Sequence, residues 1–121
     1  MALTSTRLIW MDGKFVNWKD ANVHILTHAL HYGSAVFEGI HSYRTDNGTA
    51  IFRLDDHIKR LFYSANALSM KVSFTKNKIK NAIKKLIKIN KVSDAYIRPL
   101  AYYGYGIVGV FPKDKIGRAH V

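Results

Sequence analysis

The spacing of apolar residues changes near residue 54, and this change limits the folds open to the chain more than any other feature. Short runs containing apolar residues come before it, at 8–10, 14–16, 34–37, 40–43 and 50–53. Asp12-Gly13 lies between the first two runs and favours a tight hairpin, because both central turn positions need positive φ. Residues 46–48, Asp-Asn-Gly, are a second turn signal. We therefore expect an antiparallel sheet in the first half.

Helical spacing replaces this pattern in the second half. One apolar stripe comprises Leu54, Ile58, Leu61, Phe62, Ala65 and Leu68, and another comprises Ile79, Ala82, Ile83, Leu86 and Ile87. Asp55 and Asp56 suit the start of the first helix, and the second helix is expected to begin near Thr75. Pro99 then interrupts an extended segment at 95–103. These elements predict an α+β fold in which two helices pack against an antiparallel sheet.

The formal net charge of +11 raises the question of a nucleic-acid partner. Much of the excess lies between Lys71 and Lys91, where the lysines fall largely on the polar side of the second predicted helix. Aromatic residues are not interleaved with them, so a platform for stacking bases is missing. A solvated helix face is the favoured interpretation, and a basic, non-catalytic binding module is the alternative from another functional class.

Composition favours one globular domain. The hydrophobic fraction of 48% is ordinary, and 121 residues suffice for a hydrophobic core. The lack of cysteine excludes a disulfide scaffold and a cysteine-rich zinc site. The first seven residues lack the apolar core of a signal peptide, and no apolar run approaches the roughly 20 residues of a bilayer span. We expect a cytoplasmic protein with neither a membrane nor a nucleic-acid partner.

Three segments carry residues suited to chemistry, namely His28-Ala-Leu-His-Tyr-Gly-Ser-Ala-Val-Phe-Glu-Gly-Ile40, Leu54-Asp-Asp-His-Ile-Lys-Arg-Leu61 and Ala95-Tyr-Ile-Arg-Pro-Leu100. Arg60 is predicted to lie beside the apolar stripe of its helix, and an arginine fork can hold a phosphate through two hydrogen bonds. Tyr96 and Arg98 are two residues apart on a predicted strand, so they share a face. An aromatic ring beside a cation suits an amino acid substrate. By themselves, these residues are more typical of an ordinary surface.

Together the three segments resemble the amino-terminal half of the branched-chain amino acid aminotransferases. Those enzymes use pyridoxal 5'-phosphate (PLP) and have the D-amino acid aminotransferase-like fold, PLP fold type IV. The resemblance covers about residues 7–112 and implies that residues 1–115 are the small N-terminal domain. It implies transfer of an amino group between Leu, Ile or Val and 2-oxoglutarate, which gives branched-chain 2-oxo acids and glutamate.

The resemblance also implies roles for individual residues. His57-Ile-Lys-Arg-Leu61 matches the family's H-x-x-R-L motif, whose arginine binds the cofactor phosphate, so Arg60 inherits that role. The residues that shape the substrate site are then Phe37, Tyr96, Arg98 and, from a partner subunit, Tyr32 and Val110. The implied assembly is a homodimer or a multiple of dimers.

The lysine that bonds covalently to PLP in the family lies in a second domain, and no lysine of this chain has a matching context. We therefore expect the chain to be a fragment that is inactive alone. Residues 116–121, Ile-Gly-Arg-Ala-His-Val, do not continue the family pattern and resemble a translated sequencing adapter. We expect them to be a non-native tail.

Two further alternatives are open. Within the same fold, the chain could derive from a D-amino acid aminotransferase or an aminodeoxychorismate lyase, although residues 96–100, Tyr-Ile-Arg-Pro-Leu, favour the branched-chain enzyme. His24 and His28 are spaced as zinc ligands on a helix would be, together with nearby His31. Because no H-E-x-x-H motif and no cysteine is present, we expect neutral, hydrogen-bonded histidines and no metal.

Overall fold

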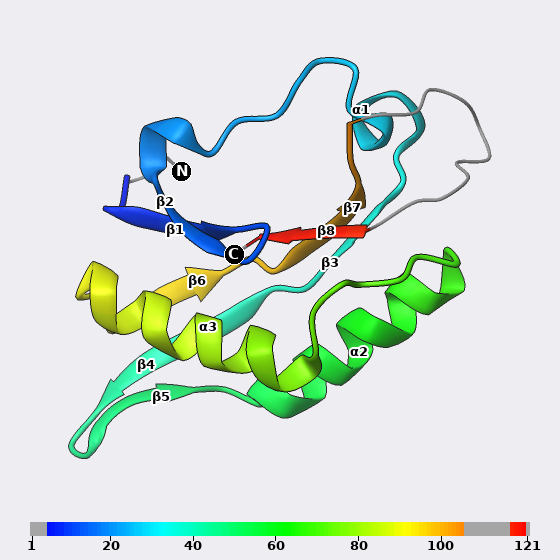
Figure 1. The fold of residues 1–121 in the computed structure, drawn as a ribbon. Coiled ribbons are helices and arrows are strands. Elements are labelled where there is room, and N and C mark those ends of the chain that lie inside the picture. Colours follow the sequence, from blue (N-terminus) through cyan, green and yellow to red (C-terminus); the bar gives the residue numbers. More distant parts are fainter. Residues whose placement is uncertain (1–4, 106–116, 121) are drawn as a thin grey trace.

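The computed structural model describes residues 5–105 and 117–120, and Figure 1 shows how their helices and strands are arranged. The strands are β1 (Leu8–Met11), β2 (Lys14–Asn17), β3 (Ala35–Phe37), β4 (Ile40–Thr45), β5 (Gly48–Ile51), β6 (Ala95–Ile97), β7 (Leu100–Tyr103) and β8 (Gly117–His120). The helices are η1 (Trp18–Asp20), a 3-10 helix, and α1 (His28–Tyr32), α2 (Leu54–Ala67) and α3 (Lys76–Asn90). The predicted α+β class is confirmed.

Local signals in the sequence account for the ends of these elements. Asp12 and Gly13 have φ of 52° and 86°, as the predicted hairpin between β1 and β2 requires. Asp55 and Asp56 lie in the first turn of α2. Thr75 is the N-cap of α3, where its Oγ1 accepts a hydrogen bond from the Lys78 backbone N–H at 3.1 Å. The predicted starts of both helices are therefore confirmed.

The strands form two antiparallel sheets where the sequence predicted one. The order is β2-β1-β8-β7-β3 in the larger sheet and β5-β4-β6 in the smaller. One register nevertheless runs through both, because Phe37 pairs with Leu100 in the larger sheet and Ile40 pairs with Ile97 in the smaller. Between these pairs the Glu38 backbone N–H donates to the carbonyl of Pro99 at 3.1 Å. Pro99 lacks an N–H group, so the reciprocal hydrogen bond cannot form and the sheet divides there.

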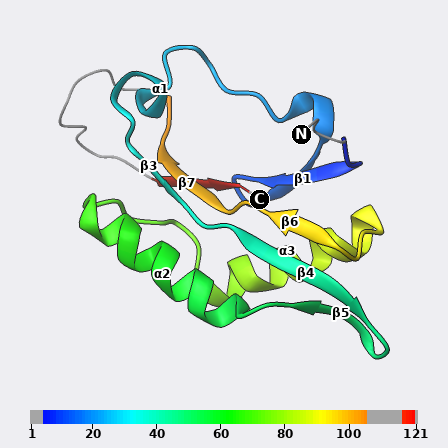
Figure 2. The ribbon, with the colours of Figure 1, turned by 180° about the vertical axis from the view of Figure 1, so that it is seen from behind.

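Helices α2 and α3 cover one face of these strands. Figure 1 shows α3 in front of β4 and β6, and Figure 2, seen from behind, shows β4 in front of α3. The main core lies between these layers and includes Trp10, Ile40, Ile58 and Ile83, each at most 2% exposed. None of the helices in the described ranges has the length and apolar character to cross a bilayer.

Strand β8 falls within the segment that the sequence analysis predicts to be a non-native tail. It lies between β1 and β7 and pairs with both. The origin of residues 116–121 stays a prediction.

Candidate functional site

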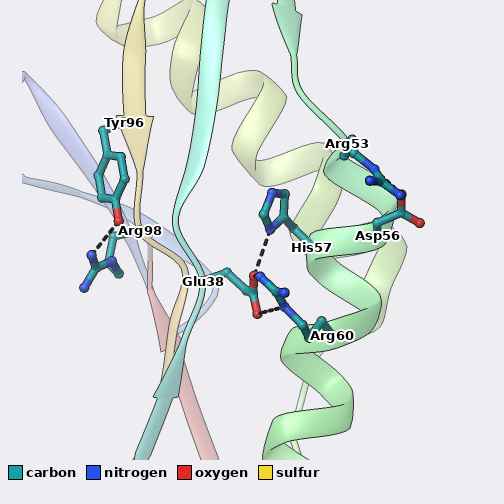
Figure 3. A network of polar contacts seen from close by, with 7 residues as sticks. All are labelled: Glu38, Arg53, Asp56, His57, Arg60, Tyr96 and Arg98. Atoms are coloured by element: carbon teal, nitrogen blue, oxygen red, sulfur yellow. Dashed lines mark hydrogen bonds and ion pairs between the residues drawn. The ribbon is translucent and has the colours of Figure 1, made fainter.

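Strand β3 pairs with β7, and β4 pairs with β6; these four paired strands are called the ladder. The predicted site residues lie on its two opposite faces. Side chains alternate along a strand, so Phe37 projects to one face and Glu38 to the other. Figure 3 shows Tyr96 and Arg98 on one side of the strands, whereas Glu38 points from the other side toward α2. Arg60 of α2 meets Glu38 there. The structure therefore divides the predicted site into two clusters.

The first cluster, called the Glu38 cluster, consists of Glu38, His57 and Arg60. Arg60 donates from Nε to Glu38 Oε2 at 2.8 Å and from Nη2 to Oε1 at 2.7 Å, which is a bidentate contact. His57 Nδ1 lies 2.8 Å from Oε1 of the same carboxylate. An ionised carboxylate only accepts hydrogen bonds, so the proton of this contact belongs to His57 Nδ1. Glu38 thus accepts three hydrogen bonds from α2.

Glu38 and Arg60, the two charged residues of this cluster, differ in their exposure to solvent and in the direction of their pKa shifts. The side chain of Glu38 is 4% exposed, whereas that of Arg60 is 66% exposed. The hydrogen bond from Arg60, with smaller contributions from the His57 hydrogen bond and from the charge of Arg60, lowers the pKa of Glu38 although burial opposes this. The same hydrogen bond raises the pKa of Arg60. Glu38 is therefore an ionised anchor on the inner side, and Arg60 is a cation open to solvent.

The bidentate contact leaves one edge of the Arg60 guanidinium available. A guanidinium has five N–H donors, and Glu38 takes the Nε hydrogen and one on Nη2. Both Nη1 hydrogens and the second Nη2 hydrogen make no hydrogen bond within the described part of the chain. That edge offers two parallel donors to an incoming oxyanion, and a phosphate matches their spacing.

The second cluster, called the Tyr96 cluster, consists of Phe37, Tyr96 and Arg98. Arg98 Nη2 donates to the Tyr96 hydroxyl at 2.6 Å. Its guanidinium carbon lies 4.2 Å from the centroid of the Phe37 ring and 5.2 Å from that of the Tyr96 ring, so the cation is near two aromatic side chains. Both rings are 55% exposed. The cluster therefore presents an apolar surface and a hydrogen-bonding cation side by side, as the sequence predicted for this face.

The two clusters meet at a strand edge. β3 is the last strand of its sheet, so its outer edge is unpaired among the described residues. On β4, pairing with β5 extends from Thr45 to Ser42, and a hydrogen bond from the Phe52 N–H to the His41 carbonyl at 2.9 Å follows. Residues 37–39 lie beyond that pairing. A molecule against this edge can therefore contact side chains from both faces of the ladder.

The structure does not bring Tyr32 into either cluster. It lies in α1, where its ring centroid is 4.5 Å from that of His28 and 6.3 Å from that of His31. Its side chain is exposed. The predicted role of Tyr32 in the site of a partner subunit stays a prediction. Val110, for which the same role is predicted, lies outside the described residues.

The histidines near α1 do not have the helical spacing that a pair of zinc ligands would need. His24 precedes α1, which begins at His28, so the two are not neighbours on one helix face. His28 Nδ1 lies 2.6 Å from Ser34 Oγ, and His31 Nε2 lies 2.8 Å from the Ile25 carbonyl. Within 5–105 and 117–120, no group of three or more His, Cys, Asp or Glu side chains could hold a metal ion.

Sequence reasoning gave no role to Glu38 or His57, which hold Arg60. One signal was present, because Glu38 is a charged residue between Phe37 and Gly39 in a segment otherwise apolar or small. A carboxylate in a buried strand needs a partner, since an unpaired buried charge is costly. The partner lies 22 residues further along the chain, so only the packing of α2 on β3 and β4 identifies it.

Comparison with known proteins shows the family. The family model described as amino-transferase class IV matches residues 35–115, which include the Glu38 cluster and the Tyr96 cluster. The chain belongs to the class IV aminotransferase family. Its resemblance to the branched-chain members, predicted from three short segments, is confirmed.

Relatives of this aminotransferase chain align over most of its length. It is 47% identical over 97 residues to the branched-chain-amino-acid aminotransferase of Pseudomonas aeruginosa, covering 80% of this chain and 32% of the relative. It is 42% identical over 104 residues to that of Escherichia coli K12, covering 86% and 34%. The chain spans about a third of the length of these curated relatives.

A solved structure shows the same fold. The T.th. branched-chain amino acid aminotransferase with pyridoxamine 5'-phosphate superposes with a TM-score of 0.94 at 42% identity. The match covers 98% of this chain and 40% of that one. The predicted fold, the N-terminal part of a class IV aminotransferase, is therefore confirmed.

Proposed function

We propose that this chain is part of a PLP-dependent enzyme that transfers the amino group between L-branched-chain amino acids and 2-oxoglutarate. The observation that carries the proposal is the exposed edge of the Arg60 guanidinium, which is held by Glu38, while the neighbouring residue Phe37 carries its exposed ring and Arg98 on the other face of the strand. The names of the Pseudomonas aeruginosa and Escherichia coli relatives support the reaction class. The T.th. structure supports the cofactor, because it contains pyridoxamine 5'-phosphate.

The residues of the Glu38 cluster fit the phosphate of PLP. Arg60 would hold the phosphate through its Nη1–Nη2 edge, while Glu38 and His57 keep the guanidinium in place. PLP would supply the aldehyde that accepts the amino group and the ring that withdraws electrons. The contribution of this chain is thus to anchor and orient one end of the cofactor.

The residues of the Tyr96 cluster fit an amino acid with an aliphatic side chain. Arg98 and the Tyr96 hydroxyl would hydrogen-bond a substrate carboxylate, while the face of Phe37 would cover the side chain. Each buried CH₂ group contributes about 0.8 kcal/mol, which favours Leu, Ile and Val over polar side chains. We further propose a cytoplasmic homodimer in which Tyr32 and Val110 approach the substrate of the partner subunit.

The test of the cofactor assignment is replacement of Arg60 by Ala in the full-length gene product. We expect PLP to bind about 10- to 100-fold more weakly, as loss of a charge-assisted hydrogen-bonding pair implies. Spectrophotometric titration of the apoprotein with PLP measures the change. Unchanged PLP affinity would reject Arg60 as a phosphate ligand.

Arg53→Ala is a matched control. Arg53 lies at the N-cap of the same helix, is 64% exposed and pairs with Asp56 at 2.8 Å, and Figure 3 shows its side chain turned toward Asp56 and away from Glu38. We expect Arg53→Ala to leave PLP affinity unchanged. Substrate class is tested separately by comparing L-Leu with D-Ala as amino donor for the unsubstituted protein. Preference for D-Ala would replace the branched-chain assignment with the D-amino acid enzyme.

A further inference from the structure

Gly39, between β3 and β4, occupies a position where a side chain would collide with Tyr96. A Cβ atom built on Gly39 would overlap the Tyr96 hydroxyl oxygen and would lie 3.0 Å from its Cζ and 3.2 Å from its Cε2. These distances are shorter than ordinary van der Waals contact. The Tyr96 ring therefore lies in the space that the missing side chain leaves.

The backbone does not explain the glycine. Gly13, Gly33 and Gly48 have positive φ, the conformation that most other residues avoid, but Gly39 does not. Its φ is outside the positive range that disfavours alanine. Glycine is therefore required at this position because it leaves space for the Tyr96 side chain.

The strand register explains why Tyr96 reaches Gly39. His41 pairs directly with Tyr96, and Gly39 is two residues before His41 on the same face of the ladder. A diagonal neighbour of this kind is within reach of an aromatic side chain. The Tyr96 ring leans across this diagonal, and its hydroxyl then meets Arg98 Nη2 at 2.6 Å.

We propose that Gly39 is a positioning residue that determines where the Arg98 guanidinium lies. The contacts form one chain: Gly39 leaves room for the Tyr96 hydroxyl, the hydroxyl accepts from Arg98, and Arg98 lies over Phe37. A side chain at position 39 would displace the hydroxyl and release Arg98 from this arrangement. The consequence for substrate rests on the proposed function: the glycine places the cation that binds a substrate carboxylate.

The experiment compares Gly39→Ala, Tyr96→Phe and the double variant in the full-length gene product. Tyrosine labelled with ¹³C at Cζ reports the position of the Tyr96 phenol by NMR, and Tyr96→Phe assigns its signal. Steady-state kinetics with L-Leu and 2-oxoglutarate give KM and kcat. We expect Gly39→Ala to shift the Tyr96 signal and to raise KM for 2-oxoglutarate about three- to tenfold, the size of one lost hydrogen bond, with a smaller change in kcat.

The double variant separates positioning from general damage. Tyr96→Phe removes the hydroxyl oxygen that a Cβ at position 39 would overlap. The ring atoms at 3.0 and 3.2 Å remain, and a ring shift of a few tenths of an ångström accommodates them, so adding Gly39→Ala to it is expected to change KM less than about twofold. Tyr96→Phe alone is expected to raise KM as Gly39→Ala does, and it retains the native glycine if Gly39→Ala fails to fold. Multiplying effects in the double variant, or an unmoved Tyr96 signal in folded Gly39→Ala, would overturn the proposal.

Failure of the proposed function has a different signature. It would appear in the unsubstituted protein as absence of amino transfer from L-Leu. The NMR signal then still decides whether Gly39 positions Tyr96, because that measurement does not depend on catalysis.

Discussion

Replacing Glu38 by Gln tests whether the buried carboxylate holds α2 against the ladder. The carboxylate is 4% exposed and accepts three hydrogen bonds from His57 and Arg60. Glutamine keeps the shape but offers one acceptor oxygen and one NH₂ group. In the more favourable orientation of the glutamine amide, its oxygen takes the place of Oε1, which accepts from His57 and from Arg60 Nη2. Its NH₂ group then faces the Nε hydrogen of Arg60. One charge-assisted hydrogen bond becomes a donor–donor contact, and the two others lose the negative charge.

The magnitude follows from these contacts. A hydrogen bond to a charged group contributes about 1.5–3 kcal/mol, and Arg60 recovers part of this because its exposed guanidinium can turn to water. We expect Glu38→Gln to lower the free energy of unfolding at pH 7 by about 1–2 kcal/mol. Urea denaturation followed by circular dichroism measures the change.

The pH dependence gives the sharper test. Arg60 and His57 lower the pKa of Glu38 from its ordinary value of 4.5, so the ionised carboxylate stabilises the folded state above that pH. This contribution is lost as the pH falls from about 4.5 through the lowered pKa. The stability difference between the unsubstituted protein and Glu38→Gln should therefore shrink over that acid range.

Asp55→Asn is the matched control. Lys80 lowers the pKa of Asp55 by a hydrogen bond, with Nζ and Oδ1 3.0 Å apart, but the Asp55 side chain is 79% exposed. Solvent screens such a pair, so we expect a much smaller loss of stability than for Glu38→Gln. Equal stability of Glu38→Gln and the unsubstituted protein at pH 7 would refute the reasoning. So would a stability difference that does not change with pH.

Two further predictions concern the layer behind the ladder, and urea denaturation measures both. Thr75→Ala removes the hydroxyl that caps α3 and should cost about 1 kcal/mol, whereas Thr75→Ser should retain most of the stability; equal losses would contradict a capping role. Ile83 is fully buried between α3 and the strands, so Ile83→Ala should cost about 2–5 kcal/mol by opening a cavity, and a loss under about 1 kcal/mol would show that the core closes around the gap.

Much of the fold could be predicted because its signals are local. The turn at Asp12-Gly13 needs only two residues with positive φ, and both have it. The starts of α2 and α3 depend on caps and acidic residues within one turn, and their apolar stripes recur at fixed spacing. In each case, the residues that determine the structure are neighbours in the chain.

The features that the sequence did not predict depend on packing between distant segments. α1 has five residues, too few for a periodic pattern, and its helix was not expected. The division into two sheets depends on what Pro99 meets across the ladder. The pairing of Arg60 with Glu38, and the position of both on the face opposite Tyr96, require the register that only the folded chain establishes.

The alternation at residues 37–40 has a consequence for how this segment can vary. Substitution of Phe37 alters only the face of the Tyr96 cluster and leaves the anchor of Arg60 on the other face undisturbed. Insertion or deletion of one residue between Phe37 and Ile40 would instead disturb both faces. It would exchange the two faces for every later residue of β4, driving Ile40 into solvent and His41 into the core. Variants of this chain can therefore differ in residue identity within the segment, provided that they keep its length.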